Sequence, residues 1–178
     1  MPANLSWELR MQRIWTAADG TSVVIRPIEP SDLCLTEKFD SELSPQSKYR
    51  RLLSERRLSS AELRRFTRID PRREIALIGV VGDPGDLKQV GVARCVDDEA
   101  GESAEFAIVV SDDWQQRGLG AVLLSALIDA ARLHGVRRME AITMADNRGM
   151  LTLAQKLGFS ARPDPAEPKL IELALSLV

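Results

Sequence analysis

The segment between residues 103 and 135 constrains the fold of this chain more than any other part of its sequence. Ser103–Val110 has the alternation of a strand, a short polar loop follows, and an amphipathic helix then extends from Gly118 to His134. Gly135 is the kind of residue that ends such a helix. A strand joined closely to a long helix predicts a chain in which helices pack against a sheet.

The segments on either side predict further strands and short helices. Before this unit we expect, in order, strands 11–16 and 22–28 joined by an Asp-Gly turn, helices 31–43, 46–57 and 60–69, and strands 74–81 and 90–96. After it we expect a strand over 138–144, a helix over 147–157 and a strand over 170–177. This order predicts an α/β (α+β) fold whose central sheet is mixed and mostly antiparallel, with helices on both faces.

The composition narrows the possible classes of function. The chain has 178 residues, which predicts one domain over 1–178, with 1–20 as an N-terminal extension and first hairpin strand. A net charge of -2 gives no general attraction for nucleic acid or a membrane surface. Two cysteines, Cys34 and Cys95, and one histidine, His134, are too few for a disulfide framework or a zinc site. No apolar run approaches the length of a membrane span, so we expect a cytoplasmic protein without a bound metal.

The residues around Gly118 are suited to binding an anion. The first N–H groups of a helix have no partner within the helix, and the helix dipole favours negative charge there. Gly118 and Gly120 carry no side chain that would keep a phosphate away, and Gln115, Gln116 and Arg117 add donors. These residues predict a pyrophosphate cradle, although the glycines alone are equally typical of a tight strand-to-helix turn.

Two common phosphate-binding motifs do not match this segment. The Walker A pattern needs Gly-Lys followed by Ser or Thr, and no such tripeptide occurs. The G-x-G-x-x-G pattern of dinucleotide-binding folds fails at its third glycine, where Leu123 stands. A protein that binds NAD or ATP remains an alternative, without a matching motif.

Several segments resemble the GNAT superfamily of acetyltransferases. Gln115-x-x-Gly118-x-Gly120 is similar to the family's acyl-CoA pyrophosphate loop, and the segment from Asn147 to Phe159 is similar to its second motif. Further segments resemble the GNAT domain of bacterial Pat-type protein lysine acetyltransferases: Ile25–Ile28, Leu43–Tyr49 and Ala104–Ala107. The resemblance covers roughly residues 20–177, and it implies a GNAT-like fold with acetyl-CoA as the acetyl donor.

The resemblance also implies which residues bind acetyl-CoA. The pantetheine arm is expected along the strand before the loop, and the pyrophosphate at the loop and the start of the helix. The expected cofactor-binding residues are Ile108, Val110, Gln115, Gln116, Arg117, Gly118, Leu119, Gly120, Ala121 and Asn147. Ile108 and Val110 are equally suited to the core, and Asn147 is also a favourable N-cap for a helix.

Glu105 is the expected catalytic residue. Acetyl transfer needs a neutral amine, whereas a lysine ammonium has a pKa of about 10.4, so a carboxylate beside the thioester can serve as general base. The resemblance places a base at this Ala-Glu-Phe-Ala position, and the alternative is a structural carboxylate held by an arginine. Many relatives have a tyrosine that protonates the leaving thiolate where this chain has Ala154. The single tyrosine, Tyr49, is more typical of a packed aromatic side chain.

The acceptor is the least constrained part of the expected reaction. We expect direct acetyl transfer to a primary amine in a ternary complex, with a protein lysine as the first candidate. A small-molecule amine, or a non-catalytic acyl-CoA sensor, is the alternative. The nine arginines from Arg50 to Arg73 are typical of a solvated helical face with pairs such as Arg51–Glu55. They would otherwise dock an acidic partner or the nucleotide end of coenzyme A.

Overall fold

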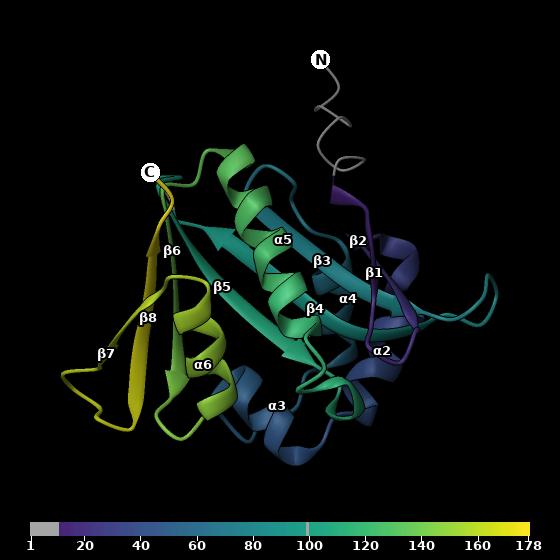
Figure 1. Ribbon diagram of the computed structural model, residues 1–178, viewed down its shortest axis with the longest axis horizontal. Coiled ribbons are helices and arrows are strands. Elements are labelled where there is room, and N and C mark those ends of the chain that lie inside the picture. The colour runs from purple at the N-terminus through teal and green to yellow at the C-terminus, as the bar shows by residue number, and fades with distance from the viewer. Residues whose placement is uncertain (1–10, 99) are drawn as a thin grey trace.

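A single sheet runs through the computed structural model, which describes residues 11–98 and 100–178 (Figure 1). The described strands are β1 (Arg13–Thr16), β2 (Ser22–Pro27), β3 (Glu74–Val81), β4 (Lys88–Asp97), β5 (Ser103–Val110), β6 (Arg138–Met144), β7 (Ser160–Pro163) and β8 (Leu170–Ser176). They form an eight-stranded sheet in the order β1-β2-β3-β4-β5-β6-β8-β7. Every neighbouring pair is antiparallel except β5 and β6, which are parallel. The expected mixed, mostly antiparallel sheet is therefore confirmed.

Helices cover both faces of this sheet. The described helices are α2 (Leu33–Glu42), α3 (Pro45–Leu52), α4 (Ser60–Thr67), α5 (Leu119–His134) and α6 (Arg148–Lys156), with single 3₁₀ turns at Pro30–Asp32 and Asp112–Trp114. In Figure 1, α5 and α6 lie in front of the sheet and α2, α3 and α4 lie behind it. One apolar cluster packs Leu123 and Leu127 of α5 against the sheet, and a second packs Phe39 of α2 against Ile78 and Val109. The α5 side and the α2 side thus each have a core of their own.

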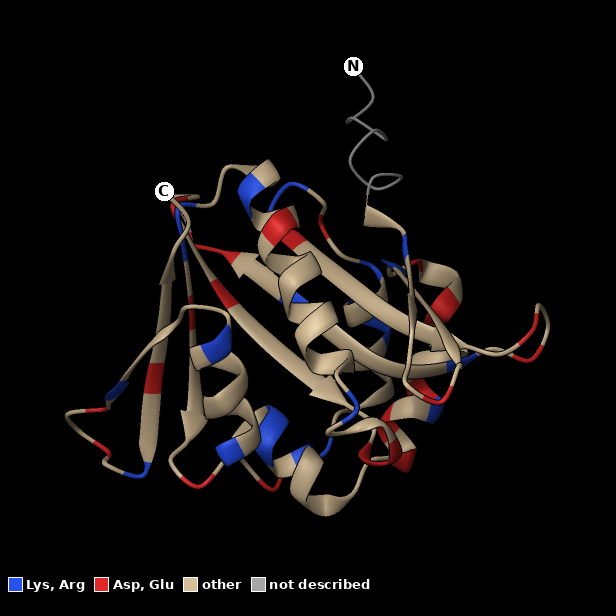
Figure 2. Cartoon of the chain, viewed as in Figure 1, with Lys and Arg blue, Asp and Glu red and all other residues tan. Residues whose placement is uncertain are grey.

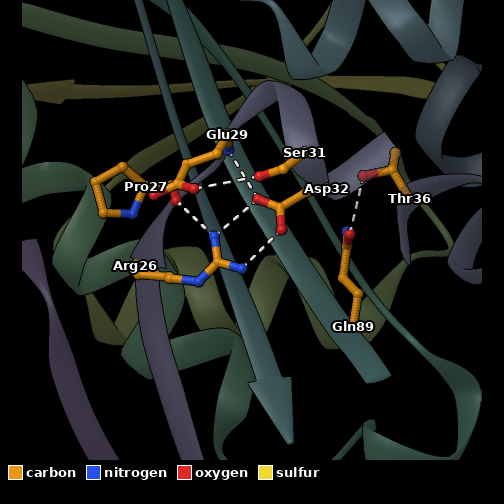
Figure 3. Close-up of polar contacts among 7 residues, drawn as sticks. All are labelled: Arg26, Pro27, Glu29, Ser31, Asp32, Thr36 and Gln89. Atoms are coloured by element: carbon orange, nitrogen blue, oxygen red, sulfur yellow. Dashed lines mark hydrogen bonds and ion pairs between the residues drawn. The ribbon is translucent and has the colours of Figure 1, made fainter. Parts of the chain in front are cut away.

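A partly buried ion pair fixes the corner between β2 and α2, and its arginine, Arg26, belongs to the Ile25–Ile28 segment that the sequence singles out (Figure 3). Arg26 donates from both terminal nitrogens to the two oxygens of Asp32, each at 2.7 Å. The same carboxylate accepts the backbone N–H of Glu29 at 2.8 Å. This hydrogen bonding raises the pKa of the Arg26 guanidinium. Nearby, Thr36 donates to Gln89 at 3.1 Å, which ties α2 to β4. These residues have a structural role, because they hold α2 on the sheet.

The structure differs from the expected elements in two places. The helix expected over 46–57 ends at Leu52, because Leu53 adopts a left-handed backbone with φ of 50° and interrupts it. Strand β7 was not expected, because its four residues are all exposed and lack any apolar alternation. It is held by antiparallel pairing with β8. The first ten residues of the expected N-terminal extension lie outside the described residues.

Strands β5 and β6 separate along their length. Their pairing is limited to Ser103–Glu105 on β5 and Arg138–Glu140 on β6. Beyond that point β6 continues to pair with β8 as far as Met144, while β5 continues to Val110 with β4 as its only partner among the described strands. Figure 1 shows the two strands diverging toward the end where α5 begins. The edge of β5 that faces β6 is therefore free to pair with another extended group.

None of the helices in the described ranges has the length and apolar character that crossing a membrane requires. The longest of them, α5, has 16 residues.

The two cysteines differ in their surroundings, which predicts different reactivity. Cys34 is exposed, whereas Cys95 is buried on β4, and burial raises the pKa of the Cys95 thiol to about 12. Because the thiolate is the reactive form, we expect one thiol per chain to react with a disulfide reagent in the native protein. The second should react only after unfolding in denaturant. Rapid reaction of both thiols under native conditions would contradict this assignment.

Candidate functional site

A cavity of about 860 Å³ occupies the space where β5 and β6 diverge. Its wall is built from β5, β6, the loop before α5, the first turn of α5, α3 and α6. A cavity of this size can hold a drug-sized or larger ligand. It lies where the sheet leaves backbone groups unpaired, so both shape and hydrogen-bonding capacity point to a binding site.

Most of the residues predicted from the sequence meet in this cavity. The predicted residues that line it are Glu105, Ile108, Val110, Gln115, Gln116, Gly118, Gly120, Ala121 and Asn147. They come from three segments separated in sequence, β5, the loop with the start of α5, and the start of α6. Their convergence depends on the parallel β5–β6 pair, which brings α6 beside the loop.

Two predicted residues, Arg117 and Leu119, do not line the cavity. The Leu119 side chain is fully buried in the α5-side core. The Arg117 guanidinium lies over the Trp114 ring, 4.1 Å from its centroid, and forms an ion pair with Asp19 in the first hairpin turn. Stacking and pairing hold this side chain against the hairpin rather than toward the cavity.

The two glycines of the loop have different physical roles. Gly118 has φ of 96°, a conformation that other residues rarely adopt, and a Cβ there would lie 3.4 Å from the Trp15 ring. Gly120 is helical, and its Cβ would meet only Leu153 at 3.5 Å and Val110 at 3.8 Å, both ordinary contacts. The tight turn therefore accounts for Gly118. It does not account for Gly120, which instead leaves the first turn of α5 open toward the cavity.

Asp112 joins the loop before α5 to the first turn of α3. Its carboxylate accepts from the Ser44 backbone at 2.9 Å, the Ser44 hydroxyl at 2.7 Å and the Ser47 hydroxyl at 2.8 Å. Gln115 donates to Ser47 at 3.1 Å and to the Val110 carbonyl at 3.2 Å. Burial acts to raise the pKa of Asp112, but the hydrogen bonds outweigh it and the pKa is lowered. This network gives two residues of the Leu43–Tyr49 segment, Ser44 and Ser47, a structural role, because they hold the start of α3 against the loop.

Replacing Asp112 by Asn should lower the free energy of unfolding by about 1 kcal/mol at pH 7, because exposed charge-assisted hydrogen bonds are lost. Because the pKa of Asp112 is lower in the folded than in the unfolded chain, its carboxylate stabilises the fold at pH values above the unfolded-state pKa of about 3.9. The difference in the free energy of unfolding between Asp112→Asn and the parent chain should therefore disappear as pH falls below about 4. Denaturant unfolding at several pH values measures this. Asp113→Asn, an exposed neighbour in the same 3₁₀ turn, is the control and should change little.

Asn147 caps α6 as well as lining the cavity. Its side-chain oxygen accepts the Met150 N–H at 3.3 Å, and its amide nitrogen donates to the Thr143 hydroxyl at 3.1 Å. The capping role considered from the sequence is confirmed. A contact with a ligand stays a prediction for this residue.

Glu105 lies on the side of the sheet opposite α5. Phe106 belongs to the α5-side core and Val109 to the α2-side core, so alternation along β5 directs Glu105 toward the α2 side. There α3 contacts β5, and residues of both elements line the cavity. Among the described residues no arginine pairs with Glu105, which removes the support for the structural alternative. Its register partner on β6, Glu140, pairs with Arg138 instead.

Neither position considered for a general acid faces the cavity. Ala154 is buried and Tyr49 is 37% exposed, and neither lines the cavity wall. Tyr49 is therefore not the packed core aromatic that its type favours.

The contribution of α3 was missed from the sequence. Arg50, Arg51, Leu52 and Leu53 all line the cavity. The expected Arg51–Glu55 pair is wrong, because Arg51 donates to Asp40 of α2 at 3.0 Å and its side chain is only 8% exposed. Burial lowers the pKa of the Arg51 guanidinium, with Asp40 acting against that shift. A count of charges along one helix gives no sign of a pair between two helices.

Comparisons with known proteins agree with this geometry. The sequence profile of the family described as "Acetyltransferase (GNAT) family" matches residues 43–159. An acetyltransferase of Pseudomonas aeruginosa is 36% identical over 148 residues, covering 83% of this chain and 80% of that protein. Acetyltransferase Pat of Mycolicibacterium smegmatis is 33% identical over 140 residues, covering 78% of this chain and 41% of Pat. The crystal structure of the GNAT domain of S. lividans Pat superposes with a TM-score of 0.84 at 25% identity, covering 94% of this chain and 97% of that one.

Proposed function

The chain belongs to the GNAT family of acetyltransferases and uses acetyl-CoA as its acetyl donor, and on this premise we propose that it acetylates a lysine side chain of a protein with Glu105 as general base. The observation that carries this proposal is the Glu105 carboxylate in the wall of the cavity between β5 and β6, which no described side chain pairs with. Acetyl-CoA, the acetyl donor, and the acceptor lysine would meet there from opposite sides of the sheet, which we call the donor side and the acceptor side.

The donor side of the cavity fits acetyl-CoA. The pantetheine arm is peptide-like, and the free edge of β5 over residues 106–110 offers it backbone hydrogen bonds like those of an added strand. The pyrophosphate suits the first N–H groups of α5, next to the open position at Gly120. In this arrangement Gln116 adds an amide donor, and Asn147 faces the same space from α6. Gln115 lines the same space, but its two amide hydrogens are already donated to Ser47 and to the Val110 carbonyl, so it shapes the loop.

On the acceptor side, Glu105 would remove the proton that keeps the amine from reacting. A lysine ammonium must lose a proton before its nitrogen attacks the thioester carbonyl. The carboxylate takes that proton, directly or through one water, while the amine is held beside the acetyl group. As the C–S bond breaks, the attacking nitrogen loses its second proton to water and the sulfur leaves as a thiolate, and a thiol of pKa near 8.5 needs no dedicated acid. Ala154, where many relatives have tyrosine, is consistent with this route.

The resemblance to Pat-type protein lysine acetyltransferases supports a protein acceptor. It extends to Leu43–Tyr49, which in this chain forms the start of α3 on the acceptor side. We also propose that residues 1–178 act as one domain in the cytoplasm. One sheet carries both core clusters, and both cysteines are free thiols, as expected in a reducing compartment.

The test supplies acetyl-CoA with lysine-containing peptides blocked at their N-termini, and in parallel with small primary amines. Mass spectrometry locates the acetyl group, and thiol release gives the rate. Acetylation of the lysine Nε supports the proposal. Turnover with small amines alone would show that the acceptor is not a protein lysine, and binding without turnover on any amine would favour an acyl-CoA sensor. NAD and ATP serve as ligand controls in thermal unfolding.

A further inference from the structure

Arg50 is a cation on the acceptor side of the cavity that has no partner among residues 11–98 and 100–178. It lies on α3, is half-buried and lines the cavity wall. Within the described ranges it makes no ion pair and no side-chain hydrogen bond. Its neighbour Arg51 differs, because Asp40 neutralises that guanidinium and the side chain is buried beside Phe66.

Apart from Arg50 and the neutralised Arg51, the cationic residues of the cavity wall lie on the donor side. Arg148 and Lys156 are on α6, in front of the sheet together with the start of α5. Figure 2 shows basic positions on α3 and on α6 flanking the region where β5 and β6 diverge. The cations of α6 thus suit the phosphates of the donor, whereas Arg50 lies on α3, which contacts β5, the strand that carries Glu105.

Judged by the part of the chain that the structure describes, the acceptor side therefore presents the Arg50 guanidinium and the Glu105 carboxylate without ion-pair partners. A ligand that complements both must carry a cationic amine and an anion. A carboxylate is the natural partner of arginine, which binds it through two parallel hydrogen bonds, and the half-buried setting of Arg50 strengthens that contact. A phosphate of coenzyme A is the competing ligand for Arg50, because Ser47, one turn earlier on α3, accepts a hydrogen bond from Gln115 of the loop before α5.

We propose that Arg50 selects acceptor lysines that have an aspartate or glutamate beside them in the acceptor protein. This inference rests on the proposed protein acceptor and adds the chemistry that distinguishes one lysine from another. The lysine amine meets Glu105 and is deprotonated there, while the neighbouring carboxylate binds Arg50. Arg50 is then a specificity-determining residue and takes no part in proton transfer.

Three peptides that differ only next to the acceptor lysine test this, with Asp, Asn or Lys at the flanking positions. We expect kcat/KM to be about tenfold higher for the Asp peptide than for the Asn peptide, the size of one partly buried charge-assisted contact. The Lys peptide should be the poorest. In the variant Arg50→Glu the order should reverse, and Arg50→Lys should retain part of the original preference.

Arg57→Glu is the matched control, because it makes the same change of charge at an exposed position that does not line the cavity. It should keep the preference for Asp. Stabilisation by acetyl-CoA in thermal unfolding should be unchanged in Arg50→Glu, which shows that the variant is folded and that its donor site is intact.

Three outcomes overturn the proposal in distinguishable ways. Equal rates on the three peptides would show that a protein lysine is accepted but that Arg50 does not select it. A raised KM for acetyl-CoA in Arg50→Glu, with peptide preference unchanged, would place Arg50 on the donor. Failure of every peptide, with turnover of a small amine, would remove the proposed protein acceptor and this inference together.

Discussion

Replacing Glu105 by Gln is expected to lower kcat for acetyl transfer by about 10²- to 10⁴-fold, the range that general acid–base catalysis contributes. The amide has nearly the same shape as the carboxylate but cannot accept the proton of the ammonium. Because Glu105 is exposed and has no ion pair among the described residues, its replacement should leave the free energy of unfolding almost unchanged. Steady-state rates with a lysine peptide and saturating acetyl-CoA measure the effect.

Glu140→Gln provides a matched control for this variant. Glu140 is the register partner of Glu105 on β6 and has the same side-chain chemistry, but it pairs with Arg138 and does not line the cavity. It should keep nearly full activity. Both variants should bind acetyl-CoA as the parent chain does, so the loss in Glu105→Gln should appear in kcat. Turnover by Glu105→Gln at the parent rate would show that another group is the base.

The sequence was sufficient to place Glu105 beside the loop before α5, because local pattern carries that information, while its role as general base stays a prediction. A carboxylate at an otherwise apolar strand, directly before a glycine-containing loop, is visible without any tertiary contact. Its place on the α2 side of the sheet also follows from alternation along β5. What the pattern could not give is the separation of β5 from β6, which arises because their parallel pairing ends at Glu105 and Glu140. The cavity depends on that separation.

Charged side chains were the least predictable part of the site. Arg51 was expected to pair along its own helix with Glu55, a favourable i,i+4 spacing, yet it pairs with Asp40 of α2. Arg117 was expected at the anion cradle and instead stacks on Trp114 beside Asp19 of the first hairpin. In both cases a contact between segments distant in sequence outweighs a contact that local spacing allows. The partner of a long charged side chain therefore depends on the tertiary structure and not on local spacing alone.

Replacing Gly120 by Glu is expected to abolish acetyl-CoA binding while leaving the unliganded fold as stable as before or more so. Gly120 is the second residue of α5 and is helical, so a side chain there causes no backbone strain. Glu has a better helix propensity than Gly, and a carboxylate in the first turn interacts favourably with the helix dipole. Together these effects should add about 0.5–1.5 kcal/mol to the free energy of unfolding.

The same carboxylate would occupy the position proposed for the pyrophosphate. Two like charges about 4 Å apart repel by roughly 4 kcal/mol at the effective dielectric of a protein surface, so affinity for acetyl-CoA should fall at least about 100-fold. Thermal unfolding measures both effects. Acetyl-CoA at about 100 times its Kd should stabilise the parent chain by roughly 2.7 kcal/mol, and Gly120→Glu should show no shift at that concentration.

Gly120→Gln separates charge from size at this position. The side chain has the same length and the same contacts with Leu153 and Val110, but it carries no charge and offers amide donors to a phosphate. We expect it to weaken acetyl-CoA binding far less than Gly120→Glu does. Equal loss in the two variants would mean that the first turn of α5 excludes any side chain by size alone. Full binding by Gly120→Glu would place the pyrophosphate away from this helix, and the proposed donor site with it.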